Sequence, residues 1–271
     1  MKKKPKAHFT CEYIINPQHR ISVNLIGLGG TGSQVLDALA RIDAALYKLG
    51  HPGLSVTCYD ADTVSESNIG RQMFSPADIG LNKAVCLATR VNRFYGLDWE
   101  AVPEFYNLHS TPANITVSCV DTVKSRLLIN ESLKSNYSAN YLTNPYYWLD
   151  FGNSAKSGQV ILGTPKKIAQ PKKSTYNVVS KLPTIMDLYD LTQIDENESG
   201  PSCSLAEALK KQDLFINSTL AQLGSAILWS LFREGILNYH GNLSQPENNA
   251  NQSVVAEVAH AASVTQATHL L

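Results

Sequence analysis

The stretch ISVNLIGLGGTGS, residues 21–33, decides the fold of this chain. Its first six residues are mostly apolar or β-branched and predict a buried strand, which stops at a cluster of glycines. Apolar residues then recur at steps of three and four, as in an amphipathic helix; these are Val35, Leu36, Leu39, Ile42 and Leu46. A second β-branched run, LSVTCY at residues 54–59, ends in Asp60 and Asp62. The order strand, glycine turn, helix, strand predicts the opening βαβ unit of a nucleotide-binding sheet.

The rest of the chain continues this alternation of strands and helices. Helical patterns are expected at 84–91, 125–133 and 220–231, and strands at 115–120, 147–151 and 159–162. The strand at 115–120 again ends in an aspartate, Asp121. We therefore expect an α/β fold, a Rossmann-like doubly wound mixed sheet with a crossover loop and a C-terminal helix.

Composition divides the chain into five segments. We expect an N-terminal arm at 1–20, whose lysines are solvated, and a nucleotide-binding domain at 21–165. Residues 166–204 are rich in Lys, Pro, Ser, Asp and Glu and predict a long crossover loop, which for such a length is usually functional. A helix that returns to the domain is expected at 205–240, followed at 241–271 by a polar tail that is either weakly helical or disordered.

Composition also excludes several classes of protein. The 271 residues carry 23 Lys and Arg against 23 Asp and Glu, so there is no basic excess for nucleic acid. Five cysteines without a C-x-x-C pair argue against a disulfide framework and against structural zinc. We found no apolar signal segment, and the longest apolar stretch, 214–232, is interrupted by polar residues. No metal-binding histidine motif and no G-x-S-x-G motif is present. We expect a cytoplasmic protein without a membrane segment.

The glycine motif by itself leaves the ligand open. Gly27, Gly29 and Gly32 fit G-x-G-x-x-G between a strand and a helix, where glycines let the backbone approach phosphates. Dehydrogenases, flavoproteins and ATP-using enzymes share this motif. Asp60 stands where a carboxylate can bind ribose hydroxyls, although capping of a loop is the simpler alternative for it.

The residues after the second strand resemble the ThiF/MoeB/HesA family, the E1-like enzymes that activate ubiquitin-like proteins. That family carries G-x-G-G-x-G, then D-x-D-x-V-x-x-S-N-x-x-R-Q, then G-x-x-K, then a strand that ends in Asp. This chain matches each motif in order, at residues 27–32, 60–72, 80–83 and 118–121. A weaker similarity is Gly158-Gln159-Val160, which resembles the G-Q-[VI] strand of these sheets.

The resemblance implies an ATP- and Mg²⁺-dependent adenylation domain at 21–165. It implies that Asp60 binds the ribose, that Asn68, Arg71 and Lys83 bind phosphates, and that Asp121 holds Mg²⁺. The full implied ATP site comprises Gly27, Gly29, Gly30, Gly32, Asp60, Asp62, Asn68, Arg71, Gln72, Lys83 and Asp121. Such cations and carboxylates suit the charge that develops when ATP reacts with a carboxylate. For Arg71 and Lys83, the alternative to phosphate binding is that each forms a salt bridge on the surface.

A candidate catalytic cysteine follows the crossover segment. Pro201-Ser202-Cys203-Ser204-Leu205 resembles the P-x-C-[ST]-[LIV] setting of the thioester-forming cysteine in ubiquitin-type E1 enzymes. A helix that starts at this point would lower the pKa of the Cys203 thiol. The alternative interpretation of Cys203 is that it is merely a small residue at the beginning of a helix, without a catalytic role. Cys58, Cys86 and Cys119 fall within predicted strands or helices and are expected to be core residues.

This chain lacks two motifs that many members of the family have, and this limits which members it resembles. The zinc-binding C-x-x-C pairs of many bacterial members are absent, and so is the R-Y-x-R-Q segment that lends an arginine to the partner subunit; Arg20 is a candidate substitute. The absence of the zinc pairs and the sequence of residues 144–163 make the chain most similar to the ThiF-family proteins of the plasmid-associated PRTRC gene system. Those proteins occur with a small ubiquitin-like partner.

We therefore expect an enzyme that adenylates the C-terminal carboxylate of a ubiquitin-like β-grasp protein and that acts as a homodimer. Cys203, Arg71, Lys83 and Asp121 would be its catalytic residues. Two alternatives stay open at this point: an NAD-dependent Rossmann oxidoreductase, and a non-catalytic E1-like scaffold subunit.

Overall fold

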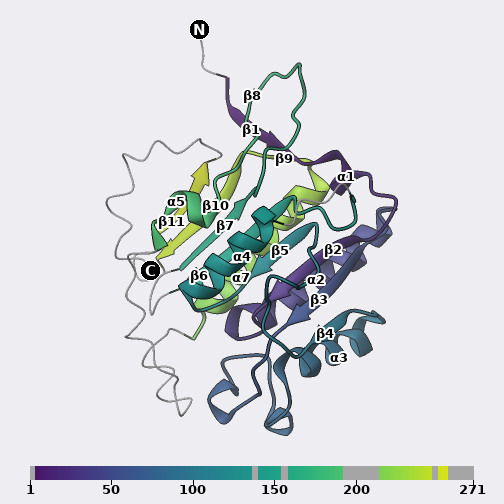
Figure 1. Ribbon diagram of the computed structural model, residues 1–271, viewed down its shortest axis with the longest axis vertical. Coiled ribbons are helices and arrows are strands. Elements are labelled where there is room, and N and C mark those ends of the chain that lie inside the picture. The colour runs from purple at the N-terminus through teal and green to yellow at the C-terminus, as the bar shows by residue number, and fades with distance from the viewer. Residues whose placement is uncertain (1–3, 136–139, 154–157, 192–213, 246–249, 256–271) are drawn as a thin grey trace.

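A computed structural model of the chain describes residues 4–135, 140–153, 158–191, 214–245 and 250–255 (Figure 1). A mixed sheet of eight strands, in the order β11-β10-β7-β6-β5-β2-β3-β4, forms its centre. The strands are β2 (Ile21–Ile26), β3 (Leu54–Tyr59), β4 (Glu100–Val102), β5 (Ile115–Ser118), β6 (Tyr147–Asn153), β7 (Gly158–Gly163), β10 (Tyr239–Gln245) and β11 (Ala250–Val255). The five strands from β6 to β4 are parallel, whereas β7, β10 and β11 continue the sheet in antiparallel fashion. This confirms the predicted doubly wound mixed sheet.

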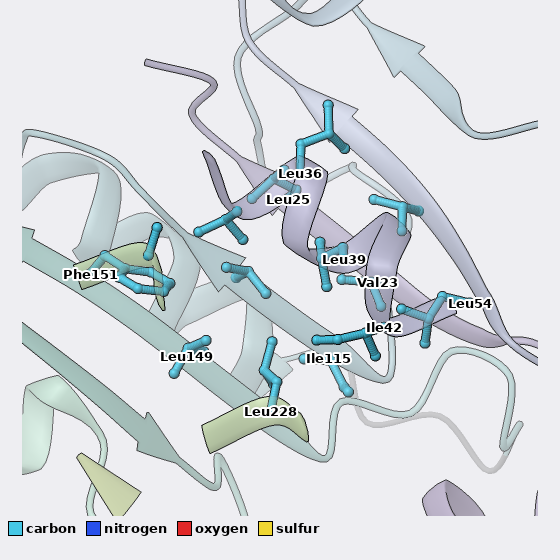
Figure 2. Close-up of a cluster of buried hydrophobic side chains, with 14 of the residues drawn as sticks. Val23, Leu25, Leu36, Leu39, Ile42, Leu54, Ile115, Leu149, Phe151 and Leu228 are labelled. Carbon is cyan, nitrogen blue, oxygen red and sulfur yellow. The ribbon is translucent and has the colours of Figure 1, made fainter. Parts of the chain in front are cut away.

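Three long helices cover one face of the sheet. They are α2 (Gly30–Lys48), α3 (Lys83–Tyr95) and α7 (Ile216–Arg233). The amphipathic stripe predicted after the glycine turn is buried as expected, and Figure 2 shows Leu36, Leu39 and Ile42 against strand residues such as Val23 and Leu25. This helix-covered face holds the larger apolar core.

The other face carries a smaller core under α4 (Val123–Ser135) and α5 (Ile185–Leu188). Ile129 and Leu133 of α4 pack with Trp148 of β6, and Tyr106 closes the same cluster from the loop after β4. Two short 3-10 helices, at Glu66–Asn68 and Pro76–Asp78, lie in the connection between β3 and α3. Within the part of the chain described, no helix has the length and apolar character that a membrane span requires.

Part of the expected N-terminal arm, residues 6–15, forms secondary structure. Strand β1 (Lys6–Phe9) forms a small sheet with β8 (Asn177–Val178) and β9 (Ile236–Leu237), and a short helix α1 (Glu12–Ile15) follows it. Ala7 and His8 are completely buried. The lysines suggested an arm because they dominate the composition there, whereas the short KAHF strand gives almost no periodic signal.

The expected polar tail also differs from the structure over its first part. Residues 239–245 and 250–255 form an antiparallel pair that extends the sheet beyond β7. The buried His240 ring, whose Nδ1 lies 2.9 Å from the Leu162 carbonyl oxygen, anchors this addition. Asn, which is frequent here, is depleted in strands, so the pairing of β10 with β7 and of β11 with β10, and not local sequence, determines these strands. The remainder of the tail, 256–271, lies outside the described residues.

Candidate functional site

A cleft of about 620 Å³ opens at the carboxyl ends of the parallel strands β3, β2, β5 and β6. This edge is where open α/β sheets bind ligands. The predicted residues that line the cleft are Gly27, Gly29, Gly30, Asp60, Asp62, Arg71, Gln72, Lys83 and Asp121. The fold thus gathers residues spread over almost a hundred positions into one site.

The glycine loop joins the end of β2 to the start of α2 with almost no spare space. Gly27 has a positive φ of 86°, and a Cβ atom there would stand 2.8 Å from the Cys119 carbonyl oxygen. A Cβ on Gly32 would stand 1.8 Å from the Gly27 carbonyl oxygen, so Gly32 allows the turn to close and does not line the cleft. The loop therefore presents the N-terminus of the 19-residue helix α2 to the cleft, where its amides favour an anion.

Asp60 braces this loop from the neighbouring strand. The Leu28 backbone N–H donates to Asp60 Oδ2 at 2.6 Å, and the Asp62 N–H donates to Oδ1 at 2.9 Å. Burial raises the pKa of the Asp60 carboxyl group, and these two amide donors oppose that shift. Asp60 therefore caps the loop, as the alternative interpretation proposed, and it also lines the cleft.

Lys83 reaches the cleft from the first turn of α3 and is paired there. Its Nζ lies 2.9 Å from Asp62 Oδ2; the lysine side chain is 11% exposed and that of Asp62 59%. Asn82 caps the helix by accepting from the Val85 N–H, and its Nδ2 donates to the Asp60 carbonyl oxygen. The first turn of α3 is thereby tied to the end of β3, so the ammonium group has a fixed place beside the glycine loop.

Arg71 and Gln72 lie in the connection before α3, on the same side of the cleft. Burial lowers the pKa of the Arg71 guanidinium group, which nevertheless stays charged at neutral pH. Asn68, in contrast, does not line the cleft. It is 7% exposed, and its Oδ1 accepts from the Ser65 N–H at 2.8 Å, so in this structure it caps a 3-10 turn.

Asp121 stands at the end of β5 with its side chain exposed at the cleft. Beneath it lies a buried ion pair that no sequence motif indicated. Arg126 Nε donates to both carboxylate oxygens of Asp150 at 3.1 and 3.2 Å, while its Nη2 donates to the Val120 carbonyl oxygen at 2.8 Å. Asp150 is 1% exposed and Arg126 7%. The pair therefore fixes the backbone just before Asp121; a charged residue within the apolar strand YWLDFG was the available signal.

The donor set fits a magnesium ion that is shared with a bound phosphate. No group of three or more His, Cys, Asp or Glu residues capable of holding a metal occurs among the residues described. Mg²⁺ commonly uses one or two carboxylates and takes its other ligands from phosphate oxygens and water. The exposed carboxylate of Asp121, in the same cleft as the N-terminus of α2, is compatible with that arrangement.

The end of the cleft beyond Asp121 contains residues that no motif indicated. Asn153, the last residue of β6, and Asn217, in the first turn of α7, both line it. Asn217 Oδ1 accepts from Asn153 Nδ2 at 2.8 Å and from Thr31 Oγ1 at 3.0 Å. Nearly two hundred residues separate Thr31 from Asn217, so only the packed fold brings them together.

The cysteines divide into described and undescribed ones. Cys203 belongs to residues 192–213, which lie outside the described part of the chain. Cys11, Cys58, Cys86 and Cys119 are free thiols, and burial raises the pKa of each, that of Cys58 to about 12. Cys58 is buried as predicted, whereas Cys86 and Cys119 are half-buried. Arg20 forms an exposed pair with Asp98 at 2.5 Å and does not line the cleft.

The sequence profile of the ThiF family matches residues 17–271. The chain belongs to the ThiF family. Its curated relatives include ubiquitin-like modifier-activating enzyme 5 of Aedes aegypti, 27% identical over 139 residues that make up 43% of this chain and 32% of that protein. The rice enzyme of the same name (Oryza sativa subsp. japonica) is 25% identical over 172 residues, 55% of this chain and 36% of that protein. The chain thus spans about a third of the length of these relatives.

Solved structures support the ThiF-type fold over most of the chain. E. coli MccB with MccA aligns with a TM-score of 0.60 at 17% identity, covering 93% of this chain and 68% of that one. MccB with ATP gives a TM-score of 0.57 at the same identity and coverage. PaaA aligns with a TM-score of 0.56 at 13% identity, covering 88% of this chain and 64% of that one. At these identities the likeness shows the E1-like fold alone.

Proposed function

We propose that this ThiF-family protein is an ATP- and Mg²⁺-dependent adenylating enzyme for the C-terminal carboxylate of a small ubiquitin-like protein. The observation that carries the proposal is the set of groups that line the cleft at the carboxyl ends of the parallel strands. The N-terminus of α2, the cationic side chains of Arg71 and Lys83, and the exposed carboxylate of Asp121 are among the groups that line the same space. This is the donor set that a polyphosphate with its magnesium ion requires.

The strand order suggests how ATP would lie in the cleft. Asp60 at the end of β3 would bind the ribose, and the aromatic residues Phe105 and Tyr106, which line the cleft from the loop after β4, offer apolar surface for the base. The glycine loop, Gln72, Arg71 and Lys83 would contact phosphates, with Lys83 exchanging its Asp62 partner for phosphate oxygens. Asn68 would act only through the turn that positions Arg71. Asp121 would hold Mg²⁺, which neutralises phosphate charge when bound.

The reaction in this arrangement is a displacement at phosphorus. An oxygen of the ionised carboxylate forms a bond to the α-phosphorus, the bond from that phosphorus to the bridging oxygen of the β-phosphate breaks, and pyrophosphate leaves. No proton has to move in this step. Arg71, Lys83 and the α2 amides would stabilise the charge that accumulates on the phosphate oxygens.

Cys203 is proposed to take the acyl group from the adenylate. Its thiolate would attack the acyl carbonyl carbon, so that a C–S bond forms, the C–O bond to phosphate breaks and AMP leaves; the thiol proton passes to solvent. Each of the four described cysteines has a pKa raised by burial, which disfavours the thiolate in all of them. The assignment of this role to Cys203 therefore rests on the Pro201–Leu205 motif.

The proposal extends to the partner protein, the oligomeric state and the cellular compartment. We infer a β-grasp partner of the kind that accompanies PRTRC-system ThiF proteins, and a symmetric homodimer. Arg20 would have to leave Asp98 if it were lent to a second subunit. A reduced Cys203 requires a reducing compartment, so we place the reaction in the cytoplasm.

ATP–pyrophosphate exchange with the β-grasp partner tests the proposal. Wild type, Asp121→Ala and Cys203→Ala are compared, with Glu131→Ala as a control that removes an exposed carboxylate of α4 outside the cleft. We expect Asp121→Ala to lower exchange at least about hundredfold, as loss of a metal ligand should. Cys203→Ala should keep exchange but lose a DTT-sensitive adduct.

Two results would contradict the proposal. Binding of NAD in place of ATP in a titration would favour the oxidoreductase alternative. ATP binding without exchange with any β-grasp partner would favour the non-catalytic scaffold.

A further inference from the structure

The first turn of α7 meets the glycine loop through one buried amide. Asn217 is 5% exposed, and its Oδ1 accepts from Thr31 Oγ1 of α2 and from Asn153 Nδ2 of β6. These three residues lie on three different elements, and all three line the cleft. The amide group therefore joins the phosphate end of the cleft to the end of β6.

Close packing fixes the position from which Asn217 makes these contacts. A Cβ on Gly158 of β7 would stand 2.4 Å from Leu220 Cδ1, and a Cβ on Gly224 would stand 2.2 Å from Phe151 Cζ. Helix α7 thus lies directly on β6 and β7 and has little room to slide. Ile216, in its first turn, is completely buried, so this turn is packed into the same core.

Gly30 shows how closely the amide approaches the loop. A Cβ on Gly30 would stand 2.4 Å from Asn217 Nδ2 and 2.7 Å from Cγ. Unlike Gly27, Gly30 has no positive φ that would demand glycine. The second glycine of the Gly29-Gly30 pair is thus explained by the side chain that occupies the space of its Cβ.

We propose that Asn217 is a positioning residue for adenylation. It would hold the first turn of α2 at one distance from the end of β6, so that phosphates on the loop and a carboxylate entering from the β6 side meet in line. This inference rests on the proposed function. Loss of such alignment lowers the rate of the bound complex more than it weakens binding of ATP.

Steady-state exchange kinetics separate this role from a purely structural one. Asn217→Ala is compared with wild type and with Ser218→Ala, the next residue of α7, which does not line the cleft. We expect kcat per folded molecule to fall about tenfold with a change of less than about threefold in the KM for ATP, and Ser218→Ala to match wild type. Native protein is quantified by urea unfolding, because a merely structural residue would lower stability and leave kcat per folded molecule unchanged.

A double-variant cycle with Gly30→Ala adds a second, independent readout. Gly30→Ala alone forces the Asn217 amide away and should lower kcat at least about tenfold. In the Asn217→Ala background the obstructing amide is gone, so Gly30→Ala should lower kcat less than about threefold further. Additive effects would overturn the contact as the cause.

The outcomes for this inference and for the proposed function are distinguishable. Wild type that exchanges pyrophosphate while Asn217→Ala keeps the wild-type kcat overturns the positioning role alone. Wild type that shows neither ATP binding nor exchange overturns the proposed function, and the role of Asn217 with it.

Discussion

The two ends of the cleft are built in different ways. The phosphate and ribose part of the nucleotide end, from Gly27 to Lys83, comes from one continuous stretch of 57 residues in which each motif follows the previous one. The far end combines Arg126 and Asp150 beneath the floor with Asn153 and Asn217 from the strand and helix beside it. Local backbone geometry holds the first end, whereas buried polar contacts between distant elements hold the second.

The largest expected effect lies at the nucleotide end. Gly32→Ala places a Cβ 1.8 Å from the Gly27 carbonyl oxygen, and backbone atoms cannot turn aside as a side chain can. We expect the free energy of unfolding to fall by at least about 4 kcal/mol. Urea titration measures this fall. Gly50→Ala is the control, since Gly50 has a φ of 83° but nothing within 4 Å; strain alone should cost about 1 kcal/mol there.

At the far end of the cleft, removal of one buried charge should lower the free energy of unfolding nearly as much. Asp150→Ala leaves the buried Arg126 guanidinium without its carboxylate, which should cost about 3–4 kcal/mol of unfolding free energy. The double variant Arg126→Met/Asp150→Leu should recover most of this loss, because it leaves no buried charge. If the double variant were as unstable as the single one, packing and not charge would be the cause.

A buried contact between distant elements also lies at the opposite end of β6, and the pH dependence of stability tests it. His8 is buried against Tyr147 at the start of β6, and burial lowers its pKa from 6.5 to about 4. Between pH 4 and pH 6.5 the unfolded chain therefore binds more protons than the folded one, and stability is lost as pH falls through this window. The shift corresponds to about 3 kcal/mol at full extent.

His8→Gln tests this expectation, with the exposed His109→Gln as control. Unfolding free energies at pH 5 and pH 7 should differ less in His8→Gln than in wild type. Some pH dependence should remain, because burial also lowers the pKa of His240. An unchanged difference in His8→Gln would assign the effect to other groups.

The smallest effect is expected at Lys83 and Asp62. Asp62→Asn removes the partner of Lys83, but the carboxylate is more than half exposed, so unfolding free energy should change by less than about 1 kcal/mol. Calorimetric titration with ATP should give a dissociation constant within about threefold of wild type if phosphate replaces Asp62 as the partner. A loss of ATP binding would show that Asp62 itself contributes to the site.

The contrast between the ends also explains what the sequence could predict. The βαβ unit, its glycine loop, Asp60 and Lys83 were predictable because strand, turn and helix periods are local and the motifs are spaced along one segment. Asn68 was assigned by motif position to the phosphates, yet its side chain caps a turn in the structure. Motif position specifies where a residue lies more reliably than which atom it contacts.

Contacts between distant elements were not predictable. Nothing in the sequence near Asn217 indicates that its amide fills the space above Gly30, and nothing near His8 indicates burial against Tyr147. Strands β10 and β11 escaped prediction for the same reason, since β10 forms by pairing with β7 and β11 by pairing with β10. Cys203 stays a prediction, as its segment lies outside the described residues.

The short strand β4 has a consequence for assembly. It ends one side of the central sheet after three residues, with Glu100 exposed, and Pro103 follows without an N–H group to offer a neighbouring chain. Two copies of this protein therefore gain little by joining their sheets edge to edge through β4. A homodimer formed at this edge of the sheet would have to associate through side-chain surfaces, which specify one partner more selectively than backbone hydrogen bonds do.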